Sequence, residues 1–206
     1  GRAPFEFFGD KIKDEALLAS MRRIGAKDSD ALLFNVGSEA STNAMRGSKE
    51  SIIEIILRIF NEHVGYSTTL WVADFERQLE REGKYADFTN KISEMYGETW
   101  QDYRLKFRMR VGKMIAALTA IGYDEASADF MVRNAQKEFS ISAKELGKLI
   151  AEYCSSRGSD YRLVFLIDEV GQYIGTDNNL MLDLQNAVEE IGAATNGQAW
   201  IAITSQ

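Results

Sequence analysis

Residues 163–167 form a continuous run of aliphatic and aromatic side chains, LVFLI, without alternating polar positions. A strand with one solvated face alternates apolar and polar residues, whereas a strand covered on both faces is apolar throughout, as in parallel sheets. Parallel strands need long crossover connections, which are usually helical. The run therefore favours an α/β fold, and we expect residues 163–168 to form a strand buried on both faces.

Two other short apolar runs have the same character, ALLFNV at 31–36 and AWIAIT at 199–204. Residues 178–194 keep a helical period between the second and third runs, and the Asn196-Gly197 pair turns the chain before the third. Strand–helix–strand units pair in parallel through right-handed crossovers. We therefore expect one parallel sheet that contains all three strands.

The stretch from residue 50 to 156 is predicted to be wholly helical, in keeping with the single proline of the chain. Residues 52–60 are apolar on nearly every side, which predicts a deeply buried helix. One long helix is predicted over 99–121, and Ser142 with Glu145 forms a capping box that opens another. The three tryptophans are expected to pack in the core, namely Trp71, Trp100 and Trp200.

Composition excludes several classes of protein. Of the 206 residues 45% are apolar and 27% are charged, as in packed globular domains, and the formal charge of −7 argues against a general nucleic-acid-binding surface. The single cysteine, Cys154, excludes a disulfide framework and favours a reducing compartment. No apolar run approaches the roughly 18 residues of a membrane span, and the first residues lack a signal-peptide core. We expect a cytoplasmic protein without a membrane partner.

Two carboxylates, Asp168 and Glu169, directly follow the apolar run at 163–167. In open α/β sheets ligands bind beyond the carboxyl ends of the strands, and adjacent strand residues point to opposite faces. One carboxylate can then hold Mg²⁺ while the other activates a water, as nucleotide hydrolysis requires. The plain alternative is a strand that ends in two solvated acids.

Small polar residues follow the third predicted strand, Thr204 and Ser205. At the end of a neighbouring parallel strand they would lie beside the acidic pair and could hydrogen-bond an attacking water or a γ-phosphate. The plain alternative is a strand that runs into a polar turn. The single helix between the two signals is the spacing that a βαβ crossover requires.

These residues resemble motifs of P-loop ATPases. RLVFLIDEV is similar to the Walker B motif, and WIAITSQ is similar to the strand that carries the sensor-1 polar residue. Residues 162–206, about a fifth of the chain, resemble the large P-loop ATPase of BREX phage-exclusion systems, and residues 31–41 fit the second strand of that core. The resemblance implies that Asp168 serves Mg²⁺, that Glu169 is the catalytic glutamate, and that Thr204 or Ser205 is the sensor.

The fold implied by the resemblance is a partial P-loop NTPase sheet of the additional-strand class. Residues 1–45 and 160–206 would form the core, and residues 46–159 a large all-helical insertion between the first two strands present. In that class the Walker B strand lies between the second and fourth strands. We therefore expect 163–168 at the centre of the sheet, with the outer edge of 199–204 unpaired.

One element of the family pattern is absent from the sequence. No GxxxxGK[ST] motif occurs, because neither the RGSK at 46–49 nor Gly112-Lys113 has the upstream glycine and the following Ser or Thr. Without this motif the backbone cradle for the phosphates is missing. We expect the chain to be a piece of a longer protein, taken after the P-loop helix, that by itself binds ATP and Mg²⁺ poorly or not at all.

Two other functions remain open at this stage. In a superfamily-2-type helicase or translocase the acidic pair would begin motif II, although Val170 and Gly171 are not the residues expected after it. In a non-catalytic protein the helical block would be an interaction module beside a vestigial site. The resemblance implies other BREX proteins as partners and leaves DNA and a further copy of the chain as candidates.

Overall fold

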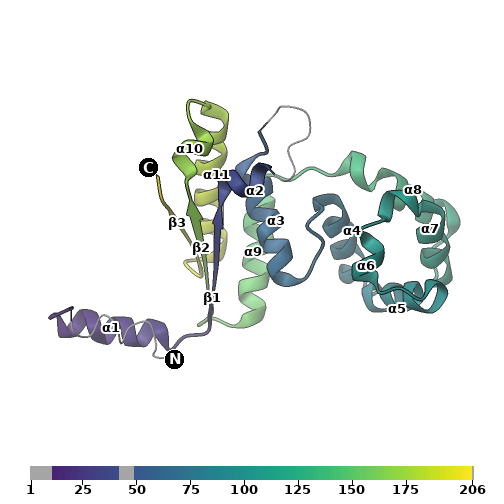
Figure 1. The fold of residues 1–206 in the computed structure, drawn as a ribbon. Helices are drawn as coiled ribbons and strands as arrows, with labels where there is room; N and C mark the ends of the chain where they lie inside the picture. The colour runs from purple at the N-terminus through teal and green to yellow at the C-terminus, as the bar shows by residue number, and fades with distance from the viewer. Residues whose placement is uncertain (1–10, 42–48, 206) are drawn as a thin grey trace. The chain divides into compact units, whose positions relative to one another are not determined.

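The computed structural model describes residues 11–41 and 49–205 and divides into two compact units (Figure 1). The sheet unit comprises the chain up to Ile53 and from Ser142 onward, and the helical unit comprises Glu54–Ile141. These boundaries differ from the predicted insertion at 46–159. Helix α9 (Ala143–Arg157) belongs with the sheet, because it packs against α11 (Asn178–Thr195) and β3 (Ala199–Ile203).

The sheet contains three parallel strands in the order β1-β2-β3, where β1 is Ser29–Asn35 and β2 is Arg162–Asp168. The predicted α/β class, parallel pairing and central position of 163–168 are therefore confirmed. In the register, Asn35 lies opposite Asp168 and Ile167 lies opposite Ile203. Within the described residues the outer edge of β3 has no strand partner, as expected.

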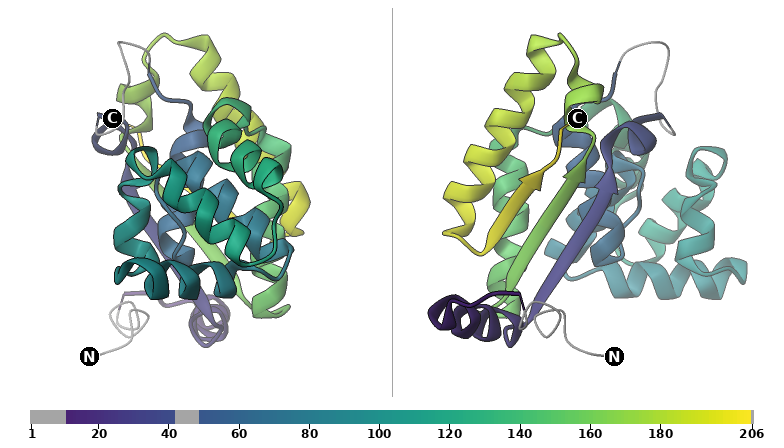
Figure 2. Two further views of the ribbon diagram at one scale, coloured as in Figure 1. Left: turned by 90° about the vertical axis from the view of Figure 1, so that its right-hand side faces the viewer. Right: turned by 60° about the vertical axis from the view of Figure 1, so that its left-hand side comes forward.

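Helices α9 and α11 cover one face of this sheet (Figure 2). Buried and half-buried residues alternate along β2, and Leu163, Phe165 and Ile167 are at most 1% exposed. The two helices approach closely at Gly147, where an added Cβ would lie 2.7 Å from the Glu190 carbonyl oxygen. Glycine is required at such a contact because no other residue leaves the space.

The opposite face of the sheet is open within the described residues. Leu33 is 75% exposed and Trp200 is 62% exposed. The prediction that Trp200 packs in the core is wrong, and the prediction that both faces are covered does not hold for the described part of the chain. A continuous apolar run shows that the side chains on both faces of a strand are apolar. Whether both faces are buried depends on which of them the helices cover.

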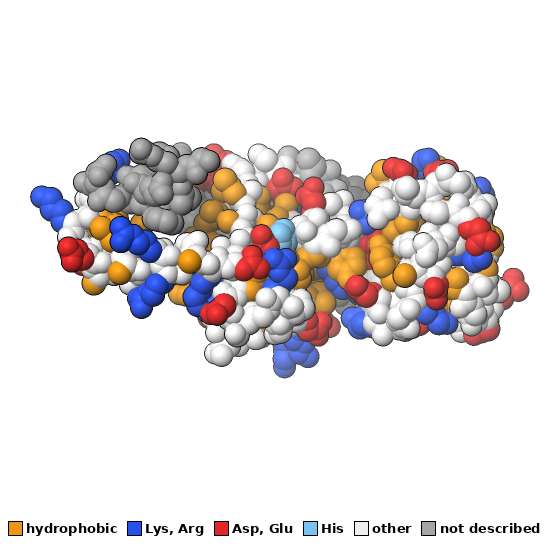
Figure 3. All heavy atoms as spheres, turned by 90° about the horizontal axis from the view of Figure 1, so that it is seen from below, with side chains coloured by type: hydrophobic (Ala, Val, Ile, Leu, Met, Phe, Trp, Pro, Cys, Tyr) orange, Lys and Arg blue, Asp and Glu red, His pale blue; other side chains and the backbone are white. Residues whose placement is uncertain are grey.

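Short helices complete the sheet unit. They are α1 (Glu15–Gly25), α2 (Val36–Ser41) and the one-turn α10 (Val170–Ile174). The two glycines within residues 170–177 predict a loop, and α10 occupies part of it. No residue of α1 is buried, and its apolar side chains lie at the surface, at the left of Figure 3. The Ser142–Glu145 capping box is confirmed. The small polar residues at 37–49 predict a loop. Residues 37–41 lie in α2 instead, so that part of the prediction is wrong, and residues 42–48 lie outside the described part.

The helical unit is built from short helices around one apolar core. Helix α3 (Ile52–Val64) spans the boundary between the units, and its residues Ile52, Ile55 and Ile56 are at most 1% exposed, as predicted for 52–60. The following helices are α4 (Leu70–Arg81), α5 (Tyr85–Tyr96), α6 (Trp100–Arg104), a 3-10 turn (Phe107–Met109), α7 (Val111–Ala120) and α8 (Glu125–Glu138). The single long helix predicted over 99–121 is therefore wrong.

A buried carboxylate, Glu76, stands inside the helical unit with its hydrogen bonds satisfied. Its Oε2 accepts from the Ser67 amide at 2.7 Å, and its Oε1 accepts from Trp100 Nε1 at 2.6 Å and from an Arg104 guanidinium nitrogen at 2.8 Å. A buried charge is tolerated only when it is paired and hydrogen-bonded in this way. Burial and the charge of Glu76 together raise the pKa of Tyr85 to about 12.

Among the described residues, no helix combines the length and the apolar character needed to cross a bilayer.

Candidate functional site

Polar residues end all three strands at the same edge of the sheet. Asn35 ends β1, Asp168 ends β2 and Thr204 directly follows β3. Since the strands are parallel, their carboxyl ends meet at one edge, which is where open α/β sheets bind ligands. The three side chains therefore stand in one row, with Asp168 in the middle.

Asp168 is tied to the end of the neighbouring strand β3. Its Oδ1 accepts a short hydrogen bond from Thr204 Oγ1 and another from the Glu169 amide at 2.9 Å. The backbone holds Thr204 in place, because its amide donates to the Ile167 carbonyl at 3.0 Å and its carbonyl accepts from the Val170 amide at 3.2 Å. The predicted proximity of Thr204 to the acidic pair is confirmed.

Glu169 leaves the strand in an unusual backbone conformation. Its φ of 58° and ψ of 29° are left-handed, and it is one of only two non-glycine residues with positive φ in the described part of the chain. This conformation costs free energy in a residue with a side chain and persists only where the surroundings hold it. Such residues cluster at functional sites.

The Glu169 side chain is held by the end of the other neighbouring strand, β1. Asn35 Nδ2 donates to Glu169 Oε2 at 2.5 Å, and Asn35 Oδ1 accepts from the Ser38 amide at 3.1 Å. The Ser38 contact fixes which way the amide points, because an oxygen must face that backbone donor. The two adjacent carboxylates are thus bound to opposite neighbours, Asp168 toward β3 and Glu169 toward β1.

Sequence reasoning overlooked Asn35. The available signal was a polar residue at the end of the first apolar run, the feature used for the other two strands. Ser205, the second candidate for the sensor, is exposed and makes no side-chain hydrogen bond to another described residue. Thr204 is therefore the residue that the structure brings to Asp168.

The donor set at the strand edge is composed of oxygen ligands, which hard cations such as Mg²⁺ prefer. Asp168 and Glu169 are both half-buried, and Thr204 and the Glu169 amide both donate to the same oxygen of Asp168, Oδ1. The same residues contain no cluster of three or more His, Cys, Asp or Glu that could hold a metal. One carboxylate suits Mg²⁺, because this ion keeps several waters and binds substrate phosphates rather than a cage of protein ligands.

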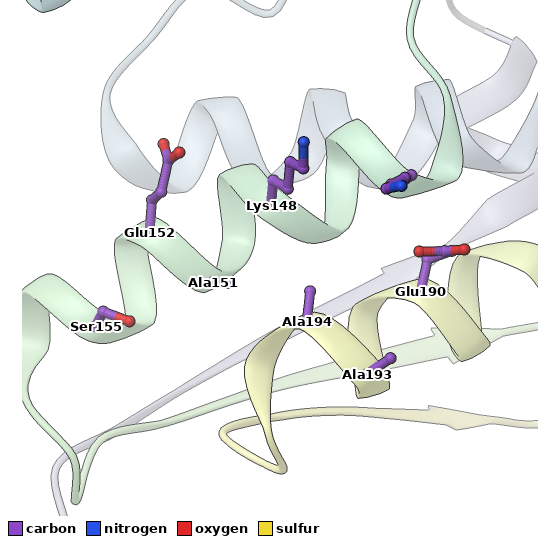
Figure 4. A pocket seen from close by; sticks show the side chains of 8 residues that line it. Lys148, Ala151, Glu152, Ser155, Glu190, Ala193 and Ala194 are labelled. Atoms are coloured by element: carbon purple, nitrogen blue, oxygen red, sulfur yellow. The ribbon is translucent and has the colours of Figure 1, made fainter.

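A separate groove of about 750 Å³ runs between α9 and α11 (Figure 4). Small side chains such as Ala151 and Ala194 line it, with Lys148 and Glu190 among its charged residues. The polar residues at the carboxyl ends of the strands do not line this groove. The candidate site is therefore defined by the hydrogen-bonded edge of the sheet.

No model of a known protein family matches the chain, and no solved structure matches it significantly.

Proposed function

We propose that this chain supplies the metal-binding and water-activating residues of a nucleoside triphosphate hydrolase. The observation that carries the proposal is that two adjacent carboxylates are hydrogen-bonded to different neighbouring strands. Asp168 accepts a hydrogen bond from Thr204, and Glu169 accepts one from Asn35, so each acid is oriented independently of the other. Hydrolysis of a phosphoanhydride needs two separately oriented groups, because one binds the metal ion on the phosphates and the other activates the attacking water.

Each residue then has a defined part. Asp168 would hold Mg²⁺, which when bound neutralises charge on the phosphates. Glu169 accepts a proton from the attacking water or orients it, using the carboxylate oxygen that Asn35 does not engage. Asn35 restrains the carboxylate, and Thr204 fixes Asp168 while presenting a hydroxyl at the same edge. All four groups lie at the end of the sheet where a substrate can approach.

The resemblance of residues 162–206 leads us to propose further that the hydrolase is the ATPase of a bacterial BREX phage-defence system. Other BREX proteins are then its proposed partners, with DNA and a further copy of the chain as the remaining candidates. The phosphate cradle must come from outside this sequence, since no GxxxxGK[ST] motif occurs in it.

The encoded sequence before Gly1 tests the source of that cradle. The proposal expects an apolar strand followed by GxxxxGK[ST], ending within about 30 residues of Gly1, the scale of one strand–helix unit. If the gene encodes no such motif, the hydrolase proposal is overturned and the non-catalytic interaction module takes its place.

Glu169→Gln tests the chemistry in the full-length protein. The amide keeps the size and a hydrogen-bonding oxygen but cannot take up a proton, so we expect ATP hydrolysis to fall at least about 100-fold while nucleotide binding is retained. Glu189→Gln makes the same change at an exposed position on α11 and should leave hydrolysis unchanged. Unchanged hydrolysis in Glu169→Gln would contradict the assigned role.

A further inference from the structure

Residues 49–51, which we name the strap, bind the two helices that follow β2. Lys49 Nζ donates a short hydrogen bond to the Tyr173 carbonyl, and the Tyr173 hydroxyl donates to the Glu50 carbonyl at 2.7 Å. Ser51 Oγ donates to Asp183 Oδ2 on α11 at 2.6 Å. The strap therefore joins α10 at two points and α11 at a third.

Helix α10 depends on such outside contacts for its position. It has only five residues, and helices much shorter than about 12 residues are not stable by themselves. Its apolar anchors are Val170, 3% exposed, and Ile174, 2% exposed. Between them lies Tyr173, whose amide donates to the Glu169 carbonyl at 3.2 Å. The helix thus carries the strap contact within one turn of Glu169.

The left-handed backbone of Glu169 must be held from both sides, because it does not persist without support. On the side of the strand, Asn35 and Thr204 contact the acidic pair. On the side of the helix, Tyr173 is hydrogen-bonded to the strap at Lys49 and Glu50. We propose that Tyr173 is a positioning residue for Glu169, and that it acts by fixing α10 to the strap. This inference rests on the proposed hydrolase function.

The strap leads directly into α3, which begins at Ile52 and continues into the helical unit.

Tyr173→Phe in the full-length protein tests the positioning role. We expect kcat for ATP hydrolysis to fall about fivefold, the value of one ordinary hydrogen bond, with KM for ATP unchanged. Hydrogen exchange at the amides of residues 170–175 should become faster by a similar factor, and this second readout does not depend on activity. Tyr96→Phe is the matched control, because Tyr96 also donates its hydroxyl to a backbone carbonyl, that of Lys113 at 3.1 Å.

The hydrogen bond from Ser51 to Asp183 gives a second pair of variants that test the strap. Ser51→Ala removes the hydroxyl and should change kcat and exchange in the same direction as Tyr173→Phe. Asp183→Asn keeps an oxygen that accepts from Ser51 and should behave nearly as the wild type. If Tyr173→Phe and Ser51→Ala match the wild type in both readouts while Glu169→Gln abolishes hydrolysis, the strap proposal alone is overturned. Hydrolysis that survives Glu169→Gln overturns both proposals.

Discussion

Two tryptophans, one in each unit, differ widely in how far they are buried. Trp100 in the helical unit is 1% exposed, whereas Trp200 in the sheet unit is 62% exposed. The helical unit closes a core of its own, and the sheet unit leaves one face of its sheet open within the described residues. The unit that carries the candidate chemistry is thus the one whose sheet has an open face within the described residues.

The core of the helical unit is built from aromatic rings. Phe88 and Trp100 meet edge to face with their centroids 5.0 Å apart, and Phe75 meets Phe88 at 5.5 Å in the same way. Edge-to-face pairs add stability beyond the area that they bury. Trp100 also donates to Glu76, so it joins the apolar core to the buried polar cluster.

Trp100→Ala should have the largest effect, and an unchanged stability of the helical unit would contradict the burial of this ring. Loss of the ring leaves a cavity and removes one donor from Glu76, and we expect the helical unit to lose about 3–5 kcal/mol of unfolding free energy. Hydrogen exchange resolved along the chain measures this loss in α4–α8. Trp200→Ala, the control on the sheet, should change exchange in neither unit appreciably.

Gly147→Ala should have an intermediate effect, confined to the sheet unit. The new Cβ would meet the backbone of Glu190, and overpacking of this kind costs about 1–3 kcal/mol. The loss of unfolding free energy is measured by unfolding in urea, monitored through the hydrogen exchange of the β2 amides. Gly192→Ala on α11 has open space around its Cβ and should be neutral or slightly stabilising. Equal destabilisation by both variants would contradict the close approach of α9 and α11.

Leu33→Ala should have the smallest effect and tests the open face within a single strand. Leu33 is 75% exposed, so its truncation should change the unfolding free energy by less than about 0.5 kcal/mol. The next residue, Phe34, is 7% exposed on the covered face, and Phe34→Ala should cost about 3–5 kcal/mol. A large loss in Leu33→Ala, measured by urea unfolding, would show that the open face is covered in solution.

Most of the sheet was predictable, because its signals are local. The three apolar runs gave the strands, and the helix between the second and third gave their parallel pairing. The polar residues after two of the runs located Asp168, Glu169 and Thr204. The break in the expected helix over 99–121 was not predictable from its apolar stripe. There Lys106 and Arg110 both bind Glu98, a contact that the periodicity does not encode.

The strands, most of the helices and the acidic pair follow from local sequence, because each depends on residues close together in the chain. The hydrogen bond from Asn35 to Glu169 depends on tertiary packing, since the two lie 134 positions apart. Tertiary packing also sets which sheet face the helices cover and how the strap reaches Tyr173, 123 positions from Glu50. Such contacts form between elements only after the chain has packed, and local patterns do not specify them.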